Sequence, residues 1–401
     1  MIKSIIAIIS LAIIYLIYGF MVSTYQVNKG LSTIHHNHPY PFFDYRGVTN
    51  VSSVRSLGSG EDREIVAEAK RAELDYLFIT DYNMLDSNAS MEAYYGDLLV
   101  LRGAKFSYLD SRLLYYRGDG LAGANTLGEI QVHLTDLLTQ PPESRGESFV
   151  VLAHPFLKGY SWTGEWPIGL DGIEIINFKR VQQQHFTESK LSSFLSLLLY
   201  PFNPELAFIR LFSEPQSEIQ LWNELNQQRS VVGHLGLEAT AKAIPFAGSV
   251  IKFPSYETQF RLGSEHVLLR SELTGNVKSD KIKILRALRR GEFYLALDVL
   301  GNPKGFNVLL EDKDQLYLMG STVKLKKNMR FRIEVPSMSA DSEVLVIRDG
   351  ETIETLPGKT TEIEIKKPGI YRFVVRLRVV LPLPDQTRWI SWIYTNPFRV
   401  E

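Results

Sequence analysis

The chain has 401 residues, a length that predicts two or three domains. Its 45% hydrophobic and 22% charged residues are typical of a protein that buries hydrophobic cores, which excludes global disorder. Lys and Arg total 44 against 45 Asp and Glu, so there is no basic surplus and we expect no nucleic-acid binding. The absence of cysteine excludes disulfides, thiolate metal sites and cysteine nucleophiles.

The amino-terminal residues 4–22 form an uncharged, apolar segment. As a helix this segment would span about 28 Å, close to the thickness of a bilayer core. A cleavable signal peptide is the alternative, but Gly19–Thr24 does not supply a small-x-small cleavage site. We therefore expect an uncleaved single-pass transmembrane anchor. The positive charge of Lys3 favours a cytoplasmic amino terminus, which would place the bulk of the chain in the periplasm.

Residues 23–46 are expected to form a linker, and residues 47–304 an α/β domain. Continuous apolar runs such as Leu74–Thr80 and Phe149–Ala153 are typical of buried parallel strands. They alternate with helical patterns such as Leu127–Thr139. Repeated strand–helix units without an internal sequence repeat predict either an α/β barrel or an open doubly wound sheet.

Residues 305–401 change to an all-β pattern. Met329–Val335 alternates apolar and polar residues, and Asp349-Gly350 is a hairpin turn signal. We expect a small antiparallel sandwich of the immunoglobulin-like type. Trp389 and Trp392 are expected to face the same side of a strand and to pack in the core of this sandwich.

Polar residues follow several of the predicted strands. Asp81 closes the strand Leu74–Thr80, His154 follows Phe149–Ala153, and Glu238 follows another apolar run. In an α/β barrel the active site lies at the carboxyl ends of the strands, where acids and imidazoles can form a metal site or an acid–base pair. A histidine on an apolar strand is also a common core residue, so the position of His154 leaves both interpretations open.

Five segments, in this order along the chain, resemble the PHP (polymerase and histidinol phosphatase) family. They are EIVAEAKRAELDYLFITDYN (64–83), VVLAHPF (150–156), GLDGIEIIN (169–177), VVGHLGLEATA (231–241) and KILRALRRGEFYLALD (283–298). The resemblance covers nearly all of the α/β part. It implies a distorted (β/α)7 barrel with a dinuclear or trinuclear metal site that cleaves phosphoesters.

Most of the metal-ligand positions that the resemblance implies are substituted here, namely at Asn50, Ser52, Tyr82, Lys105, Ser111 and Thr240. His154 alone keeps a ligand identity, and Glu238 replaces an aspartate. A catalytic divalent ion needs about three protein ligands and an open position. Lys105 would also repel a cation. We therefore expect an eroded site with the remnant residues Asp81, His154 and Glu238, and no resident cofactor.

Two further features keep alternatives open. His36 and His38 form an H-x-H pattern within the expected linker and could replace the missing metal ligands. Trp162 and Trp166 follow His154 closely and could either stack on a sugar or cap the barrel.

The function expected from these observations is a membrane-anchored PHP-like protein that acts as a non-catalytic binding or scaffold module of the cell envelope. Its partners would be the membrane, through the amino-terminal helix, and a protein or glycan. One alternative is a divergent metal-dependent phosphoesterase that uses zinc, manganese or iron, held by His154 and Glu238 together with Asp81 and one of the linker histidines. Another is a protein that binds carbohydrate or cell wall through Trp162, Trp166 and the sandwich.

Overall fold

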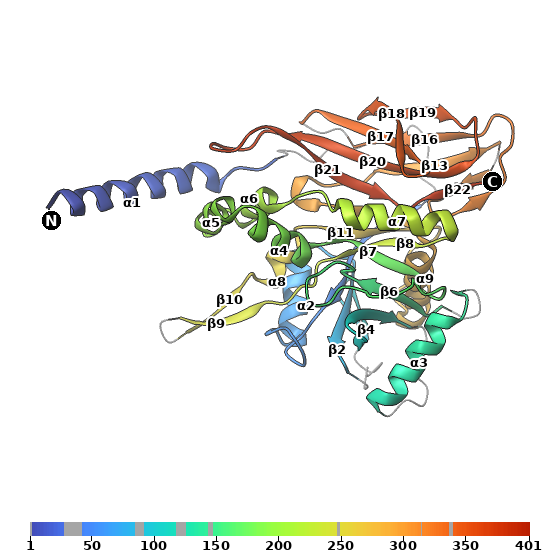
Figure 1. The fold of residues 1–401 in the computed structure, drawn as a ribbon, viewed down its shortest axis with the longest axis horizontal. Coiled ribbons are helices and arrows are strands. Elements are labelled where there is room, and N and C mark those ends of the chain that lie inside the picture. The colour runs from blue at the N-terminus through green and yellow to red at the C-terminus, as the bar shows by residue number, and fades with distance from the viewer. Residues whose placement is uncertain are drawn as a thin grey trace.

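The computed structural model describes residues 2–27, 42–84, 92–117, 126–142, 147–246, 249–313, 315–336 and 340–401. His36 and His38 lie outside the described residues, together with most of the expected linker. Helix α1 (Ile2–Ser23) extends away from a body of sheets and helices (Figure 1). It is long and apolar enough to cross a membrane, a test that a signal sequence also passes.

The α/β region contains the predicted alternation of strands and helices. Its elements are β1 (Phe43–Val51), α2 (Asp62–Arg71), β2 (Tyr76–Tyr82), β3 (Ala93–Tyr95), β4 (Leu98–Tyr108), β5 (Ser111–Tyr116), α3 (Leu127–Thr139), β6 (Phe149–Ala153), β7 (Gly172–Asn177), α4 (Phe178–Glu188), α5 (Lys190–Leu199), α6 (Pro204–Leu211), α7 (Gln216–Gln228), β8 (Val232–Gly236), β9 (Lys242–Phe246), β10 (Ser249–Phe253), α8 (Tyr256–Phe260), β11 (Ser264–Leu269), α9 (Val277–Arg290), β12 (Phe293–Ala296) and the 3-10 helix η3 (Asp298–Leu300). Strand β1 begins inside the segment expected as a linker.

The carboxyl-terminal region is built from strands, as its alternating pattern predicts. They are β13 (Asn307–Asp312), β14 (Gln315–Tyr317), β15 (Thr322–Val323), β16 (Arg330–Glu334), β17 (Ser342–Arg348), β18 (Glu351–Pro357), β19 (Thr361–Glu364), β20 (Gly369–Val379), β21 (Arg388–Thr395) and β22 (Phe398–Val400). Strands β14, β13, β16 and β19 form a separate antiparallel sheet. Its Phe331 packs against Phe373 and Phe398 of the large sheet, with ring centroids 4.9 and 5.1 Å apart, so the two sheets share an aromatic core.

The large sheet continues from one region into the other, in the order β15-β22-β20-β21-β12-β11-β1-β2-β4-β5-β6-β7-β8. Strand β12 pairs with β21 across the expected domain boundary at residues 304 and 305. Trp392 of β21 is fully buried, whereas Trp389 is 39% exposed. The expectation that both face the core is therefore wrong for Trp389, because residues three apart on a strand point to opposite faces.

Parallel pairing brings the carboxyl ends of the site-bearing strands together. Strand β1 pairs with β2 and β2 with β4, while β6 pairs with β7 and β7 with β8, all in parallel. Beyond β8, Ala239 returns to β1: Ser52 N donates to Ala239 O at 3.0 Å, and Ala239 N donates to Asn50 O at 3.2 Å. The ends of β1 and β8 therefore lie side by side.

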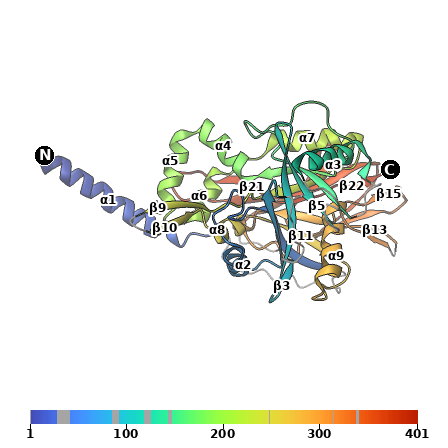
Figure 2. The same ribbon diagram turned by 90° about the horizontal axis from the view of Figure 1, so that it is seen from below.

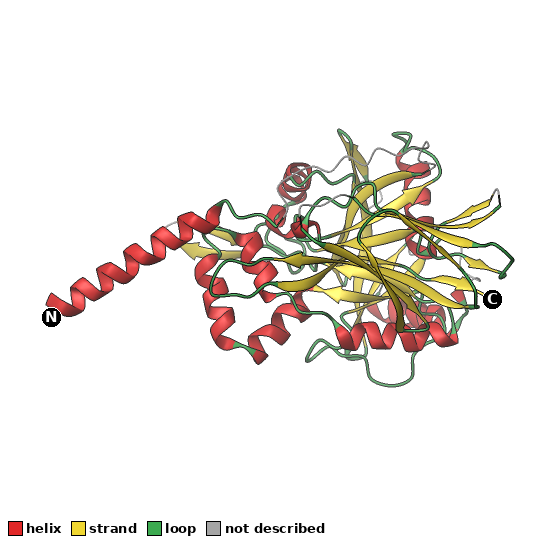
Figure 3. Cartoon of the chain, turned by 90° about the horizontal axis from the view of Figure 1, so that it is seen from above, coloured by secondary structure: helices red, strands yellow, loops and turns green. Residues whose placement is uncertain are grey.

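Helix α1 leaves the body at one end, beside α5. The views turned by 90° in Figures 2 and 3 agree with Figure 1 that the hairpin β9–β10 lies at this same end. Gly19 of α1 approaches Phe202 so closely that a Cβ at this position would lie 2.5 Å from its ring. The carboxyl-terminal part of α1 is thus packed on the body, while its first half is clear of it.

Candidate functional site

A cluster of buried polar side chains lies where the strands end. We call it the strand-end cluster and define it as Asn50, Ser52, Lys105, His154, Glu174, Asn177 and Glu238. Each of these residues is at most 6% exposed. They come from β1, β4 and β7 and from the segments that follow β1, β6 and β8. Burial of so many polar groups is costly unless they are paired with one another or with a ligand.

Glu174 is the centre of the hydrogen bonds in this cluster. Asn50 Nδ2 donates to its Oε1 at 2.6 Å, Asn177 Nδ2 donates to its Oε2 at 2.7 Å, and the His154 backbone N–H donates to Oε2 at 3.0 Å. Burial and the charge of Glu238 nevertheless raise the pKa of Glu174 to about 7. The carboxyl group therefore titrates near neutral pH and ties three strand ends together.

Glu238 is held by two lysines of different exposure. Its Oε1 lies 3.6 Å from Lys105 Nζ and 3.1 Å from Lys179 Nζ. The Lys105 side chain is 1% exposed, whereas that of Lys179 is 53% exposed. Burial alone would raise the pKa of Glu238, but Lys105, His154 and Lys179 together lower it to about 2. Glu238 is therefore a carboxylate at neutral pH, neutralised mainly by the buried ammonium group of Lys105.

His154 lies beside this ion pair as a neutral imidazole. Burial, assisted by the charge of Lys105 and opposed by Glu238, lowers its pKa to about 4. Among the described residues, five buried atoms of the cluster have no hydrogen-bond partner: Asn50 Oδ1, Ser52 Oγ, Lys105 Nζ, His154 Nδ1 and Glu238 Oε2. An unsatisfied buried polar atom costs about 1–3 kcal/mol, so the cluster retains unused binding capacity.

The backbone of the cluster is strained at three of its residues. Asn50, His154 and Glu238 have φ values of 61°, 35° and 47°. A left-handed conformation is rare for residues other than glycine and persists only where the surroundings enforce it. The three residues lie directly at or after strand ends, so the strain coincides with the unpartnered polar atoms.

Other residues expected at the site point elsewhere. Asp81 accepts hydrogen bonds from Ser53 N at 2.8 Å, Ser53 Oγ at 2.7 Å and Ser56 Oγ at 2.6 Å, so its carboxylate holds the loop after β1. The hydroxyl of Tyr82 bonds to Ser107, and its ring lies under the guanidinium of Arg112.

The remaining two substituted positions outside the cluster are Ser111 and Thr240. Ser111 is buried in β5. Thr240 donates its backbone N–H to Gln259 Oε1 at 3.2 Å. Thr240 and Glu238 both line a cavity of about 280 Å³, together with Lys179, and this cavity gives solvent a route to one side of the cluster.

A catalytic metal ion does not fit the residues that the structure brings together. Within the described parts of the chain, no three His, Cys, Asp or Glu side chains form a group that could hold one. His154 and Glu238 are two ligands where about three are needed. The ammonium of Lys105, 3.6 Å from Glu238, supplies the positive charge that an ion would otherwise provide.

The tryptophans that follow His154 pack on their neighbours. Trp162 stacks with Tyr108 at a centroid distance of 6.1 Å and with Trp166 at 6.2 Å. Both tryptophans are only partly exposed. This mutual stacking leaves less ring surface for a sugar than the carbohydrate-binding alternative requires.

Sequence patterns locate part of the cluster. Glu174 and Asn177 are the polar residues of the apolar run GIEIIN and belong to the same strand-end pattern, but only the structure reveals Glu174 as the common acceptor. Lys179 follows two residues later, where a surface lysine on α4 gives no signal of its contact with Glu238.

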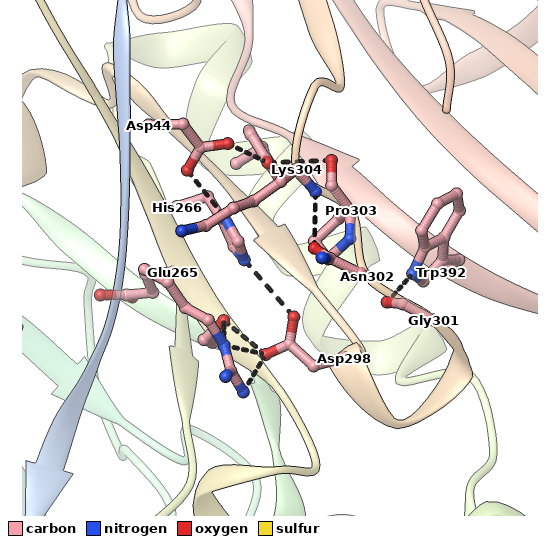
Figure 4. A network of polar contacts seen from close by, with 12 residues as sticks. Asp44, Glu265, His266, Asp298, Gly301, Asn302, Pro303, Lys304 and Trp392 are labelled. Carbon is pink, nitrogen blue, oxygen red and sulfur yellow. Dashed lines mark hydrogen bonds and ion pairs between the residues drawn. The ribbon is translucent and has the colours of Figure 1, made fainter. Parts of the chain in front are cut away.

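A second buried network lies near the start of β1. His266 of β11 is fully buried, with Nδ1 2.8 Å from Asp44 Oδ1 and Nε2 3.4 Å from Asp298 Oδ1 (Figure 4). Tyr294 stacks on the imidazole at 4.7 Å and donates its hydroxyl to Asp44 at 2.6 Å. Burial lowers the pKa of His266, but the two aspartates outweigh it and raise the pKa to about 9.

This second network has a structural role. Arg46 also pairs with Asp298 at 3.0 Å, so two cations and two carboxylates neutralise one another. The residues belong to β1, β11, β12 and η3, which the network holds together at the junction with the carboxyl-terminal region.

The Glu174→Gln variant tests the electrostatics of the strand-end cluster. The folded protein prefers protonated Glu174, so this group's contribution to stability is fully present below about pH 4.5 and is lost as pH rises through about 7. The loss corresponds to about 3 kcal/mol. We expect Glu174→Gln to remove this fall, measured as the free energy of unfolding against pH. Glu165→Gln, on an exposed loop, should leave the pH profile unchanged.

Comparison with known proteins found no match in sequence and a distant match in structure. No family model matches the chain, and no curated protein sequence matches it. A solved two-domain protein from Bacteroides vulgatus, described as containing a predicted PHP-like metal-dependent phosphoesterase, is 12% identical, with a TM-score of 0.37. The match covers 88% of this chain and 96% of that chain.

Proposed function

We propose that this chain is a membrane-anchored, non-catalytic binding or scaffold module on a PHP-like barrel, with its body in the periplasm. The observation that carries the proposal is the buried contact between Lys105 Nζ and Glu238 Oε1 at 3.6 Å. The ammonium group of Lys105 neutralises the carboxylate of Glu238, so this carboxylate does not need a metal ion to balance its charge. The strand-end cluster is then stable without the ion on which phosphoester cleavage depends.

The strand order supports a distorted (β/α)7 barrel. Seven strands follow one another in the sheet: β1, β2, β4, β5, β6, β7 and β8. The bridge between Val51 and Ala239 returns the chain after β8 to β1. Such closure would gather the strand ends around one centre, where the strand-end cluster lies.

The contacts of α1 support an anchor that is retained in the mature protein. Asn203 Nδ2 donates to Val22 O at 2.9 Å and to Tyr25 O at 3.0 Å, and Tyr15 donates its hydroxyl to Leu198 O at 2.8 Å. Removing α1 would take away Val22 O, one of the two acceptors of the buried Asn203 amide. A signal peptide has no need of such complementary contacts with the folded body.

The unpartnered atoms support a binding role for the barrel mouth. Asn50 Oδ1 and Glu238 Oε2 are hydrogen-bond acceptors, Lys105 Nζ is a donor, and Ser52 Oγ and His154 Nδ1 can accept or donate. A ligand with hydroxyl groups, which both donate and accept, would satisfy atoms of both kinds. A phosphate offers only acceptors, so it could pair with Lys105 but would leave Asn50 Oδ1 and Glu238 Oε2 without donors.

Metal analysis tests the proposal directly. Full-length protein is incubated with zinc, manganese or iron salts, desalted and analysed for bound metal, and its hydrolysis of bis-p-nitrophenyl phosphate is measured. We expect much less than one ion per chain and no hydrolysis above background. His154→Ala and the control His185→Ala should behave alike. One tightly held ion that is lost only in His154→Ala, together with hydrolysis, would overturn the proposal.

A divergent metal-dependent phosphoesterase is the second candidate. The unpartnered His154 Nδ1 and Glu238 Oε2 favour it, because both are atoms that coordinate metal ions. It requires a further ligand, for which His36 and His38 are the candidates. The same metal analysis on a His36→Ala/His38→Ala variant distinguishes it: loss of a bound ion would assign the missing ligands to this segment.

A further inference from the structure

Exposed apolar side chains surround the point where α1 meets the body. We call this surface the anchor collar and define it by residues of α5 and of the loop after β20: Leu191, Phe194, Leu197, Leu198, Val380 and Leu383. They are 71%, 56%, 55%, 38%, 66% and 79% exposed. Single exposed apolar residues are common, but a group of six large ones beside an apolar helix indicates an interaction surface.

Helix α5 has the inverse of the pattern expected in water. Its buried face consists of Ser193, Ser196 and Leu199, whereas its outer face carries the exposed Leu191, Phe194, Leu197 and Leu198. A helix on a water-facing surface buries its apolar stripe and exposes its polar one. The inversion is stable only if the outer face of α5 meets an apolar medium.

The contacts with α1 place this outer face at membrane depth. Tyr15 of α1 bonds to Leu198 O at 2.8 Å and packs edge-on against Phe202 at 5.2 Å. Tyr18 bonds to Leu383 O. Tyr15 lies seven residues before Val22, which is about 10 Å along a helix axis. If the apolar segment of α1 spans the bilayer, Leu198 is held about 10 Å inside its outer end.

We propose that the anchor collar is inserted into the outer lipid–water interface around α1, so that the body rests on the bilayer. This inference rests on the proposed anchoring by α1 and adds a second, independent contact with lipid. The occupant is a bilayer and not another protein, because the collar is continuous with the helix proposed to cross that bilayer. Insertion by about 5–10 Å is typical of interfacial helices and agrees with the depth derived from Tyr15.

The hairpin β9–β10 lies at the same end of the molecule as α1 and α5 (Figures 1 and 2). Its Ile244 is 47% exposed. The hairpin would therefore approach the same membrane surface, and the body would have a defined orientation instead of rotating freely about its anchor.

The chain contains no cysteine, so single cysteines can report the environment of each position. Phe194→Cys, Leu197→Cys and the control Val132→Cys are labelled with a nitroxide in full-length protein reconstituted in phosphatidylcholine vesicles. Val132 is 63% exposed on α3, which is remote from the anchor. Ile9→Cys, on the free part of α1, reports the anchor itself. Collision rates with oxygen, which partitions into lipid, and with a water-soluble nickel chelate are then compared.

We expect oxygen collisions to exceed nickel collisions at positions 194 and 197, and the reverse at position 132. If position 194 is as accessible to nickel as position 132 while position 9 is in lipid, the collar proposal fails and the anchor stands. If position 9 is also in water, the anchor proposal fails as well. Protection from both reagents at position 194 would mean that protein covers the collar, which also overturns insertion.

Discussion

Replacing Lys105 with methionine should lower the free energy of unfolding by about 3–5 kcal/mol at neutral pH. The substitution keeps most of the length of the side chain but removes the buried charge 3.6 Å from Glu238. Among the described residues, Glu238 would then remain a buried carboxylate paired with Lys179, whose side chain is 53% exposed and screened by water. Denaturant unfolding of the full-length protein in detergent measures the loss.

Two companion variants separate charge from packing. Lys179→Met removes the exposed partner and should cost less than about 1 kcal/mol. Lys105→Met combined with Glu238→Gln removes both charges of the buried pair, and we expect it to recover most of the stability lost in Lys105→Met. If Lys105→Met is as stable as the wild type, Lys105 does not neutralise Glu238 and the argument for a substituted metal ion falls.

The second large effect is expected from His266→Gln. At pH 7 the imidazolium of His266 neutralises Asp44 and Asp298, and its loss leaves two buried carboxylates with Arg46 as their remaining cation. We expect a cost of about 3–5 kcal/mol at this pH. The measurement is again the free energy of unfolding.

The pH dependence of this difference identifies its origin. Because the folded-state pKa of His266 is raised to about 9, its stabilisation is fully present below about pH 6.5 and is lost as pH rises through 9. The gap between wild type and His266→Gln should therefore shrink by about 3 kcal/mol between pH 6.5 and 10. His185→Gln is the control: burial lowers the pKa of His185, so its effect should not change over this range. A gap that stays constant would indicate lost packing instead of lost charge.

Local sequence patterns were sufficient to predict an element where the capping residue and the apolar pattern indicate the same structure. The boundaries of α3 follow from the capping of Glu129 N by Thr126 and from its apolar period, and those of β6 from a short continuous apolar run. The hairpin β9–β10 was not predicted, because Pro245 within β9 contradicts a strand pattern. The start of β1 at Phe43 was also missed, since its first residues gain their strand partners only from the distant β11.

The candidate site was likewise predictable from the sequence only in part. Strand-end position alone was enough to select His154 and Glu238, and both lie in the strand-end cluster. Asp81 was selected by the same logic, yet its carboxylate binds the serines of the neighbouring loop. A strand end limits where a side chain starts, but the direction of its carboxylate depends on which loop offers hydrogen-bond donors.

By itself, the sequence determined the apolar length of α1, the alternation of strands and helices, and the loss of most ligand identities that the family resemblance implies. Tertiary structure decided which charges meet: Lys105 and Glu238 come from distant segments, and only strand pairing brings them to 3.6 Å. It also decided which face of α5 is outside. Periodicity defines two stripes on a helix, but only packing selects the one that is covered. Here Ser193, Ser196 and Leu199 are covered, and Leu191, Phe194 and Leu197 are left exposed.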